Sequence, residues 1–285
     1  MSAAPQLQSI DDPRDERLAP FRELKEARLA REQGLFIAES EVVVRKLLRS
    51  TFVIRAVLVT PTRLATLAPH LGPGYPVFVA TQEVVDAVAG FNVHRGCLAA
   101  AERPRATLPP GARRVVVLEE LVDVDNVGAL VRNAAAFGAD AVLLSPGCAD
   151  AFYRKAVRTS AGHVFTLPIV RASAWPSDLE ALGRELTLVG TVVDAGAPSI
   201  ADLPPLARVA LVLGTEGTGL SRAARGLCHR LVTIPMAPGA DSLNVAVAGA
   251  VALYALGPAR RGLPGAAGLA RRVGAALRRL VSTSG

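Results

Sequence analysis

From residue 113 onward, short apolar runs alternate with segments whose apolar residues recur at helical spacing. Uninterrupted runs of valine, leucine and isoleucine are typical of strands in a parallel sheet that helices cover on both faces. The runs predict six strands, at residues 114–121, 141–146, 164–170, 186–193, 208–214 and 230–236. The predicted fold class is therefore α/β, with a doubly wound parallel sheet forming the C-terminal domain.

A smaller α/β unit is predicted before this region. Helices are expected at residues 17–32, 39–48 and 82–90, a strand at 52–60 and a closing segment at 95–104. The stretch PRATLPPGA that follows, residues 104–112, has three prolines and one glycine, which is typical of a linker. The pattern thus divides the chain into a small domain (1–108), a larger domain (109–257) and a tail (258–285).

The charge of the chain is concentrated at one end. Its formal net charge is +7. Residues 1–108 have 14 basic and 12 acidic residues (+2), residues 109–257 have 12 and 13 (−1), and the tail has six arginines and no acid (+6). A nucleic acid would therefore meet local basic patches on the two domains. The tail itself fits either a basic amphipathic helix on RNA or a membrane surface, or a solvated appendage.

The composition excludes several classes of protein. Hydrophobic residues make up 51% of the chain and the mean hydropathy is +0.34, which favours a folded protein. No apolar run reaches the ~18 residues of a membrane span, and the acidic N-terminal stretch is unlike a signal peptide. The three cysteines lie far apart and without metal-ligand spacing, so we expect no metal site and a reducing, cytoplasmic compartment.

Three stretches carry candidate chemistry. The first, LVDVDNVGALVRNAAAFGAD (121–140), predicts a helix with Asn126 as its N-cap and Gly138 just past its end. Arg132 lies off the apolar stripe of this helix, on a face that Gly128 and Ala136 are expected to keep clear. Taken alone, Arg132 also fits a solvent-facing side chain on a surface helix.

The second stretch, LVLGTEGTGLSRAARGLC (211–228), leads from a strand into a glycine-rich turn that contains Glu216. Its glycines match neither a P-loop nor the dinucleotide-binding fingerprint. The third, VTIPMAPGADSLNVAVAGAVALYAL (232–256), leads from a strand into a helix over 242–256, for which Ser242 or Asp241 is the expected N-cap.

The three stretches are expected to meet. Each follows a predicted strand, and the carboxyl ends of parallel strands lie at one edge of a sheet, where α/β proteins bind ligands. Together they form a polar cluster that contains no Cys/His or Ser/His pair. Its members are Asn126, Arg132, Glu216, Ser242 and Asn244.

The residues, order and spacing of these stretches closely resemble the three motifs of the SpoU (TrmH-like) branch of the SPOUT RNA methyltransferases, over about residues 115–256. VRTSAGHVFTLPIV (157–170) resembles another segment of this family, with His163 where a small residue is common. FIAESEVVVRKLL (36–48) and HRGCLAAAERP (94–104) resemble more loosely the small L30e-like, substrate-binding domain of members that act on ribosomal RNA. There, AES stands where xEG is usual.

This resemblance implies S-adenosylmethionine-dependent methylation of a ribose 2′-hydroxyl in RNA, expected to be 23S ribosomal RNA. It also implies a trefoil knot around the cofactor and a homodimer with the active site at the subunit contact, to which the small residues of helix 242–256 are suited. The cofactor would lie against Thr191, Gly214, Gly219, Ile234, Met236 and Leu243. Ser242 and Asn244 would face the reacting ribose, and Asn126 and Glu216 would position Arg132.

The family pattern makes Arg132 the candidate general base. Lowering the pKa of an arginine from ~12.5 to ~7 costs about 7–8 kcal/mol, so a charged guanidinium that anchors phosphate and stabilises the developing alkoxide is the alternative. Three other functions stay open: a transfer RNA 2′-O-methyltransferase, a catalytically silent SPOUT-like RNA-binding protein, and a class I methyltransferase or dehydrogenase. The last would need a glycine-rich turn after the first strand of the sheet, where LEELVDVDN has none.

Overall fold

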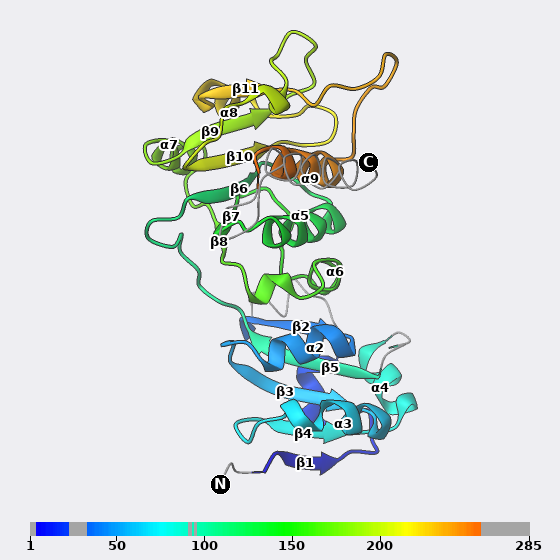
Figure 1. The fold of residues 1–285 in the computed structure, drawn as a ribbon. Coiled ribbons are helices and arrows are strands. Elements are labelled where there is room, and N and C mark those ends of the chain that lie inside the picture. Colours follow the sequence, from blue (N-terminus) through cyan, green and yellow to red (C-terminus); the bar gives the residue numbers. More distant parts are fainter. Residues whose placement is uncertain (1–3, 23–32, 91–92, 94–95, 258–285) are drawn as a thin grey trace, which may run out of the picture.

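The computed structural model describes residues 4–22, 33–90, 93 and 96–257, which form two sheets with their covering helices (Figure 1). The larger sheet has six strands, all parallel, in the order β11-β9-β10-β6-β7-β8. They are β6 (Arg114–Leu118), β7 (Ala141–Leu144), β8 (Ile169–Arg171), β9 (Thr187–Thr191), β10 (Val209–Leu213) and β11 (Arg230–Val232). The predicted α/β class and parallel sheet are confirmed.

One predicted strand is wrong over most of its length. Residues 163–165 form the 3-10 helix η4 (His163–Phe165), and β8 begins only at Ile169. Ala161 and Gly162 both adopt positive φ angles, 50° and 75°, and this turn directs the buried side chains of Val164 and Phe165 into the core instead of along a strand.

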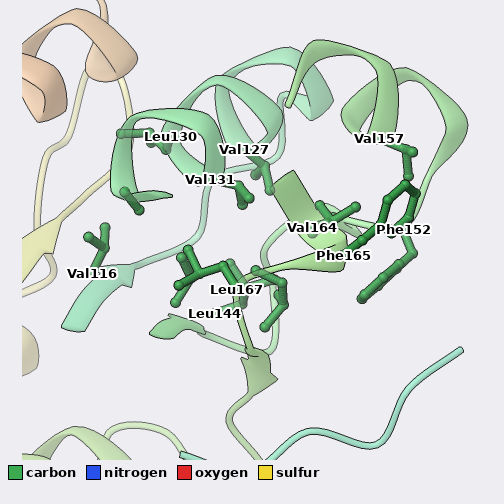
Figure 2. Close-up of a cluster of buried hydrophobic side chains, with 14 of the residues drawn as sticks. Val116, Val127, Leu130, Val131, Leu144, Phe152, Val157, Val164, Phe165 and Leu167 are labelled. Atoms are coloured by element: carbon green, nitrogen blue, oxygen red, sulfur yellow. The ribbon is translucent and has the colours of Figure 1, made fainter. Parts of the chain in front are cut away.

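Helices cover both faces of this sheet. The core on one face includes residues of α5 (Val124–Ala136), α6 (Arg154–Thr159) and α9 (Val245–Ala255). The core on the other face includes residues of α7 (Ser177–Gly183) and α8 (Arg222–Leu227). A short 3-10 helix, η5 (Ile200–Asp202), follows β9. Figure 2 shows how Val127, Leu130 and Val131 of α5 point towards Val116 and Leu144 of the sheet.

Two glycines allow α5 to pack tightly against its neighbours. A Cβ at Gly128 would lie 2.7 Å from the carbonyl oxygen of Ala156 in α6. A Cβ at Gly249 of α9 would collide with the side chain of Leu130. The expectation that Gly128 keeps a face open beside Arg132 is therefore wrong, because Gly128 is buried against α6.

The smaller sheet is mixed. Its order is β1-β4-β3-β5-β2, with β1, β4 and β3 parallel and β5 antiparallel to both of its neighbours. The strands are β1 (Gln6–Ser9), β2 (Leu35–Glu39), β3 (Ile54–Val59), β4 (Pro76–Val79) and β5 (Cys97–Glu102). The helices are η1 (Glu16–Phe21), α2 (Glu41–Leu48), α3 (Pro61–Leu67), η3 (Ala68–His70) and α4 (Gln82–Ala89). Most of the predicted helix 17–32 and the whole tail 258–285 lie outside the described residues.

The two sheets are joined by packed side chains as well as by the linker. Phe36 and Phe52 of the smaller unit form ring contacts with Phe152 and Phe165 of the larger one, with centroids 5.2–6.1 Å apart. Lys46 on α2 donates a hydrogen bond of 2.8 Å to the carbonyl oxygen of Ala161. One hydrophobic core thus continues from the first sheet into the second, with α6 between them (Figure 1).

Charged pairs reinforce this contact. Glu39 is buried, 7% exposed, and lies 3.5 Å from Arg154 and 4.0 Å from Arg158, both on α6. Arg103, next to the linker, pairs with Asp150. Because a buried carboxylate needs such partners, the first domain is anchored to the second by charge as well as by apolar packing.

No helix among the described residues is long and apolar enough to cross a membrane. None of the three cysteines, two of which are buried, forms a disulfide.

Ser40, which directly precedes α2, has a strained backbone conformation. Its φ and ψ angles are 84° and 147°, a region that residues with a Cβ rarely adopt. Its side chain forms no capping bond to α2, whose first turn follows directly. The backbone conformation therefore costs about 1–3 kcal/mol that a glycine would not carry.

Replacing Ser40 with glycine is expected to raise the free energy of unfolding by about 1 kcal/mol, since relief of strain exceeds the extra flexibility of the unfolded chain. Ser40→Ala is the matched control, because it removes the hydroxyl but retains the Cβ. Chemical denaturation should show stabilisation for Ser40→Gly alone. Equal stability of the two variants would contradict the strain.

Candidate active site

The carboxyl edge of the larger sheet carries a pocket of about 450 Å³. It lies where β9 ends at Thr191, β10 leads into a glycine-rich turn, and the chain runs on from β11 towards α9. Eight of the residues predicted from the sequence line it: Thr191, Gly214, Glu216, Gly219, Ile234, Met236, Ser242 and Leu243. Three segments far apart in the sequence are thus brought to one edge, as the strand-end argument predicts.

The turn over residues 214–220 has no free space on its inner side. A Cβ at Gly214 would collide with the backbone of Gly219 and Leu220. The turn is closed by two hydrogen bonds of 3.1 Å between the backbones of Thr215 and Gly219. Glycine is therefore required at 214 by close approach, and Gly217 and Gly219 adopt positive φ angles of 106° and 68°.

A polar cluster closes one side of the pocket. The Glu216 Oε1 atom accepts hydrogen bonds from Asn126 Nδ2 (2.9 Å) and Asn244 Nδ2 (2.7 Å), and also from the backbone N–H of Val245 (3.3 Å). Asn244 Nδ2 also donates to Asn126 Oδ1 (2.9 Å). The three predicted polar residues therefore form one network. The other carboxylate oxygen of Glu216 has no hydrogen-bond partner recorded within the described residues.

Both N-caps differ from the expectation. Asp123 caps α5, accepting from the N–H of Asn126, and this leaves the Asn126 amide free for the network. Asn244 itself caps α9, accepting from the N–H groups of Ala246 and Val247, so the helix begins at Val245 and not at residue 242. The side-chain oxygen of Asn244 closes the helix while its nitrogen reaches Glu216. A single amide performs two tasks, which accounts for its place inside the apolar run.

Arg132 stands apart from this network. It is exposed on α5, outside the residues that line the pocket, and the described residues provide no hydrogen bond or ion pair to its guanidinium. Neither Asn126 nor Glu216 contacts it. The next residue, Asn133, donates to the carbonyl oxygen of Ala246 in the first turn of α9 (2.9 Å), which fixes this part of α5 against the site.

His163 lies in the electrostatic field of Arg132. Burial and the positive charges of Lys46 and Arg132 hold the pKa of His163 below its ordinary value. The imidazole is therefore mostly uncharged at neutral pH, and the positive charge at this position belongs to the arginine and the lysine.

Sequence reasoning missed two charged residues of the pocket, Arg225 and Asp241. Arg225 lies one helical turn after Ser221, the N-cap of α8. Its helical spacing from the second motif could have predicted that it lies near the pocket. Asp241 lies within the third motif but was considered only as a cap. No group of three or more potential metal ligands occurs among the described residues.

Comparisons with known proteins agree with this geometry. The model of the SpoU rRNA methylase family matches residues 113–254, which include every predicted site residue. An uncharacterized tRNA/rRNA methyltransferase of Mycobacterium bovis is 41% identical over 261 residues, covering 87% of this chain and 91% of the relative. The chain belongs to the SpoU rRNA methylase family.

Two more distant relatives match most of the chain. A 23S rRNA (guanosine(2553)-2′-O)-methyltransferase of Bacillus subtilis is 29% identical, covering 88% of this chain and 99% of that protein. An AdoMet-bound rRNA methyltransferase from Sinorhizobium meliloti has the same fold, with a TM-score of 0.76 at 24% identity, covering 88% of this chain and 97% of the other. The resemblance seen in the sequence motifs thus extends to the first domain.

The close approach at Gly214 can be tested directly. Gly214→Ala is expected to force the 214–220 turn open and to abolish binding in the pocket, because the added methyl group meets backbone atoms that cannot yield. Gly226→Ala is the control: the space around Gly226, in α8, is open, and alanine there should be neutral or stabilising by up to ~1 kcal/mol. Calorimetric titration with S-adenosylhomocysteine compares the two. Wild-type affinity in Gly214→Ala would contradict the packing.

Proposed function

We propose that this protein transfers a methyl group from S-adenosylmethionine to a ribose 2′-hydroxyl of RNA, and that the RNA is 23S ribosomal RNA. The observation that supports this most is the convergence of the three motif loops. All six predicted cofactor residues line one pocket, and the Asn126–Glu216–Asn244 network lies at its side. Membership of the SpoU rRNA methylase family supports the same reaction.

The pocket fits the proposed cofactor. Its volume lies within the range of small-molecule sites, and its wall combines apolar side chains with backbone at Gly214 and Gly219, which have no side chain. Glu216 and Asp241 place negative charge near a ligand that carries a sulfonium. When bound, S-adenosylmethionine supplies an electrophilic methyl group on a positively charged sulfur.

The residues of this chain position the other reactant and stabilise its developing charge. The 2′-hydroxyl would give its proton to a base or to water as its oxygen bonds to the methyl carbon and the bond from that carbon to sulfur breaks. Arg132 has an exposed guanidinium with no ion-pair partner among the described residues, and we assign to it the phosphate and the developing alkoxide. Ser242, Glu216, Arg225 and Asp241 are among the polar residues that line the pocket.

We assign RNA binding to residues 1–108, because this unit packs against the larger domain beside α6, with Lys46 of α2 bonded to Ala161, and is not held by the linker alone. We also propose that this unit is L30e-like. In the larger domain, we propose a trefoil knot around residues 214–244. The knot is supported by the way residues 233–244 return from the sheet edge to α9, which packs against α5. Cysteines without disulfides fit a cytoplasmic enzyme. The Bacillus subtilis relative supports 23S RNA over transfer RNA.

A homodimer completes the proposal. Val247, Val251 and Tyr254 lie at helical spacing along α9, Leu243 lies just before the helix, and 38–68% of each residue is exposed. This apolar stripe begins beside Asn244, so a second copy seated on it would place its own surface next to the site.

Arg132→Ala should leave folding and affinity for S-adenosylhomocysteine nearly unchanged, since the side chain touches neither core nor pocket. Methyl transfer should fall by ~10²–10⁴, the loss typical of an acid–base or charge-stabilising group. Arg132→Lys separates the two roles. Lysine should restore part of the rate increasingly with pH if a base is needed, and should fail at every pH if the planar fork holds phosphate.

Single-turnover methylation of 23S RNA and transfer RNA transcripts, with mapping of 2′-O-methyl groups, provides the measurement. A wild-type rate in Arg132→Ala would make this residue an ordinary surface arginine. Binding of RNA without binding of S-adenosylhomocysteine by the wild type would show a silent RNA-binding protein, and methylation of transfer RNA alone would exclude the ribosomal assignment.

Val251→Arg is expected to convert the dimer to a monomer, because it places a charge in the centre of the α9 stripe. Val53→Arg is the matched control, since Val53 is similarly exposed but lies on the first domain. Sedimentation of both variants and of the wild type gives the mass. A wild-type protein that sediments as a monomer at micromolar concentration would contradict the proposed dimer.

A further inference from the structure

Glu119 is a buried acid that the proposed reaction does not use. It directly follows β6 and is only 2% exposed, the lowest value among the buried charged residues. A carboxylate is seldom placed in such a position unless several donors satisfy it. Its partners therefore indicate what it holds in place.

Three donors point at the Glu119 carboxylate. Oε2 accepts from the backbone N–H of Ser221 (2.8 Å), and Oε1 accepts from the Ser221 hydroxyl (2.7 Å) and from Trp175 Nε1 (2.9 Å). The backbone N–H of Glu119 in turn donates to the carbonyl oxygen of Leu213 (2.8 Å). Leu213 and Ser221 are the residues immediately before and after the glycine turn 214–220. Glu119 therefore fixes both ends of the turn that forms one wall of the pocket.

The turn itself has no slack that could absorb a change at its ends. Gly214 lies in contact with the backbone of Gly219 and Leu220, and Ser221 also caps α8 by accepting from the N–H of Ala224. Movement of Ser221 therefore moves Gly219 and Gly214 together. The charge of Glu119 also acts on Cys228, the C-cap of α8. Burial is the larger cause and this carboxylate the smaller one, and together they raise the pKa of Cys228 to about 11.

We propose that Glu119 is a positioning residue for the cofactor: by holding Leu213 and Ser221 it keeps the glycine turn in its binding form, and Trp175 is coupled to that form through the same carboxylate. This rests on the proposed use of the pocket for S-adenosylmethionine. It assigns to Glu119 an effect on cofactor binding and none on the RNA or on proton transfer.

Glu119→Gln tests the assignment. The amide replaces one acceptor oxygen by a donor, so that one N–H of Ser221 or Trp175 faces another N–H. The KM for S-adenosylmethionine and the dissociation constant of S-adenosylhomocysteine are expected to rise at least 10-fold. At saturating cofactor, kcat should stay within about 3-fold of the wild type, and the KM for RNA should not change. Glu185→Gln is the control, because Glu185 pairs with Arg208 on the surface.

Trp175 supplies a second readout, since it is the only tryptophan of the chain. Saturating S-adenosylhomocysteine should change its emission in the wild type and in Glu185→Gln, and much less in Glu119→Gln. If Glu119→Gln does not fold, Ser221→Ala removes the hydroxyl contact from the other side and should raise the same KM by a smaller factor.

The outcomes separate the two proposals. A folded Glu119→Gln protein with unchanged KM for the cofactor, or one in which kcat alone falls, overturns the role of Glu119. Failure of the wild type to bind S-adenosylhomocysteine at all overturns the proposed function instead.

Discussion

The candidate site depends on one oxygen atom. Oε1 of Glu216 accepts from Asn126, Asn244 and the N–H of Val245, which belong to α5, the start of α9 and its first turn. A carboxylate oxygen has two lone-pair sites and no donor, so the two short amide bonds occupy them and the longer contact from Val245 (3.3 Å) shares one. The donors come from two segments, α5 and the start of α9, which lie far apart in the sequence. Neither of these segments can shift without breaking a bond to the same atom, so the network fixes their relative positions.

Glu216 can occupy this position because glycines allow the surrounding segments to pack closely. Gly214 lets the turn fold back on itself, Gly249 brings α9 against Leu130 of α5, and Gly128 brings α6 against the other side of α5. Helix α5 thereby becomes the central element of the molecule. It carries Asn126, which belongs to the network, and Arg132, which lies outside it. It also packs against α6, next to which the phenylalanine cluster and Lys46 connect the first domain to the second. A displacement of the first domain would therefore be transmitted towards the site through packed, not tethered, contacts.

Much of this arrangement could be predicted from the sequence. Parallel strands require apolar runs, and their ends meet at one edge, so most strand positions and the meeting of the loops follow from local pattern. The resemblance to the SpoU motifs implied that Thr191, Gly214, Ile234 and Leu243 lie in one pocket, and all four line it. The caps could not be assigned, because Asp123, Asn126, Ser242 and Asn244 are all good caps and only the tertiary hydrogen bonds of the two asparagines decide between them.

Other features had no local signal. The role of Gly128 depends on where α6 lies. Residues 164–168 do not form the predicted strand because Val164 and Phe165 are buried in the core that continues into the first domain. Ser40 and Glu119 are similar cases. The positive φ angle of Ser40 and the partners of Glu119 appear only in the folded chain.

The partners of Glu216 also explain why Arg132 forms no ion pair with this carboxylate. Neutral amides, rather than a guanidinium, satisfy the carboxylate. Had Arg132 paired with Glu216, each charge would have cancelled the other, and neither would act on a ligand. As it stands, the negative charge lies at the pocket and the positive charge lies on the outer face of α5. In the proposed reaction the sulfonium lies on the side of the carboxylate, and the phosphate and developing alkoxide lie on the side of the arginine. The separation of Glu216 from Arg132 thus matches the charges of the two reactants, and it requires asparagine at both 126 and 244.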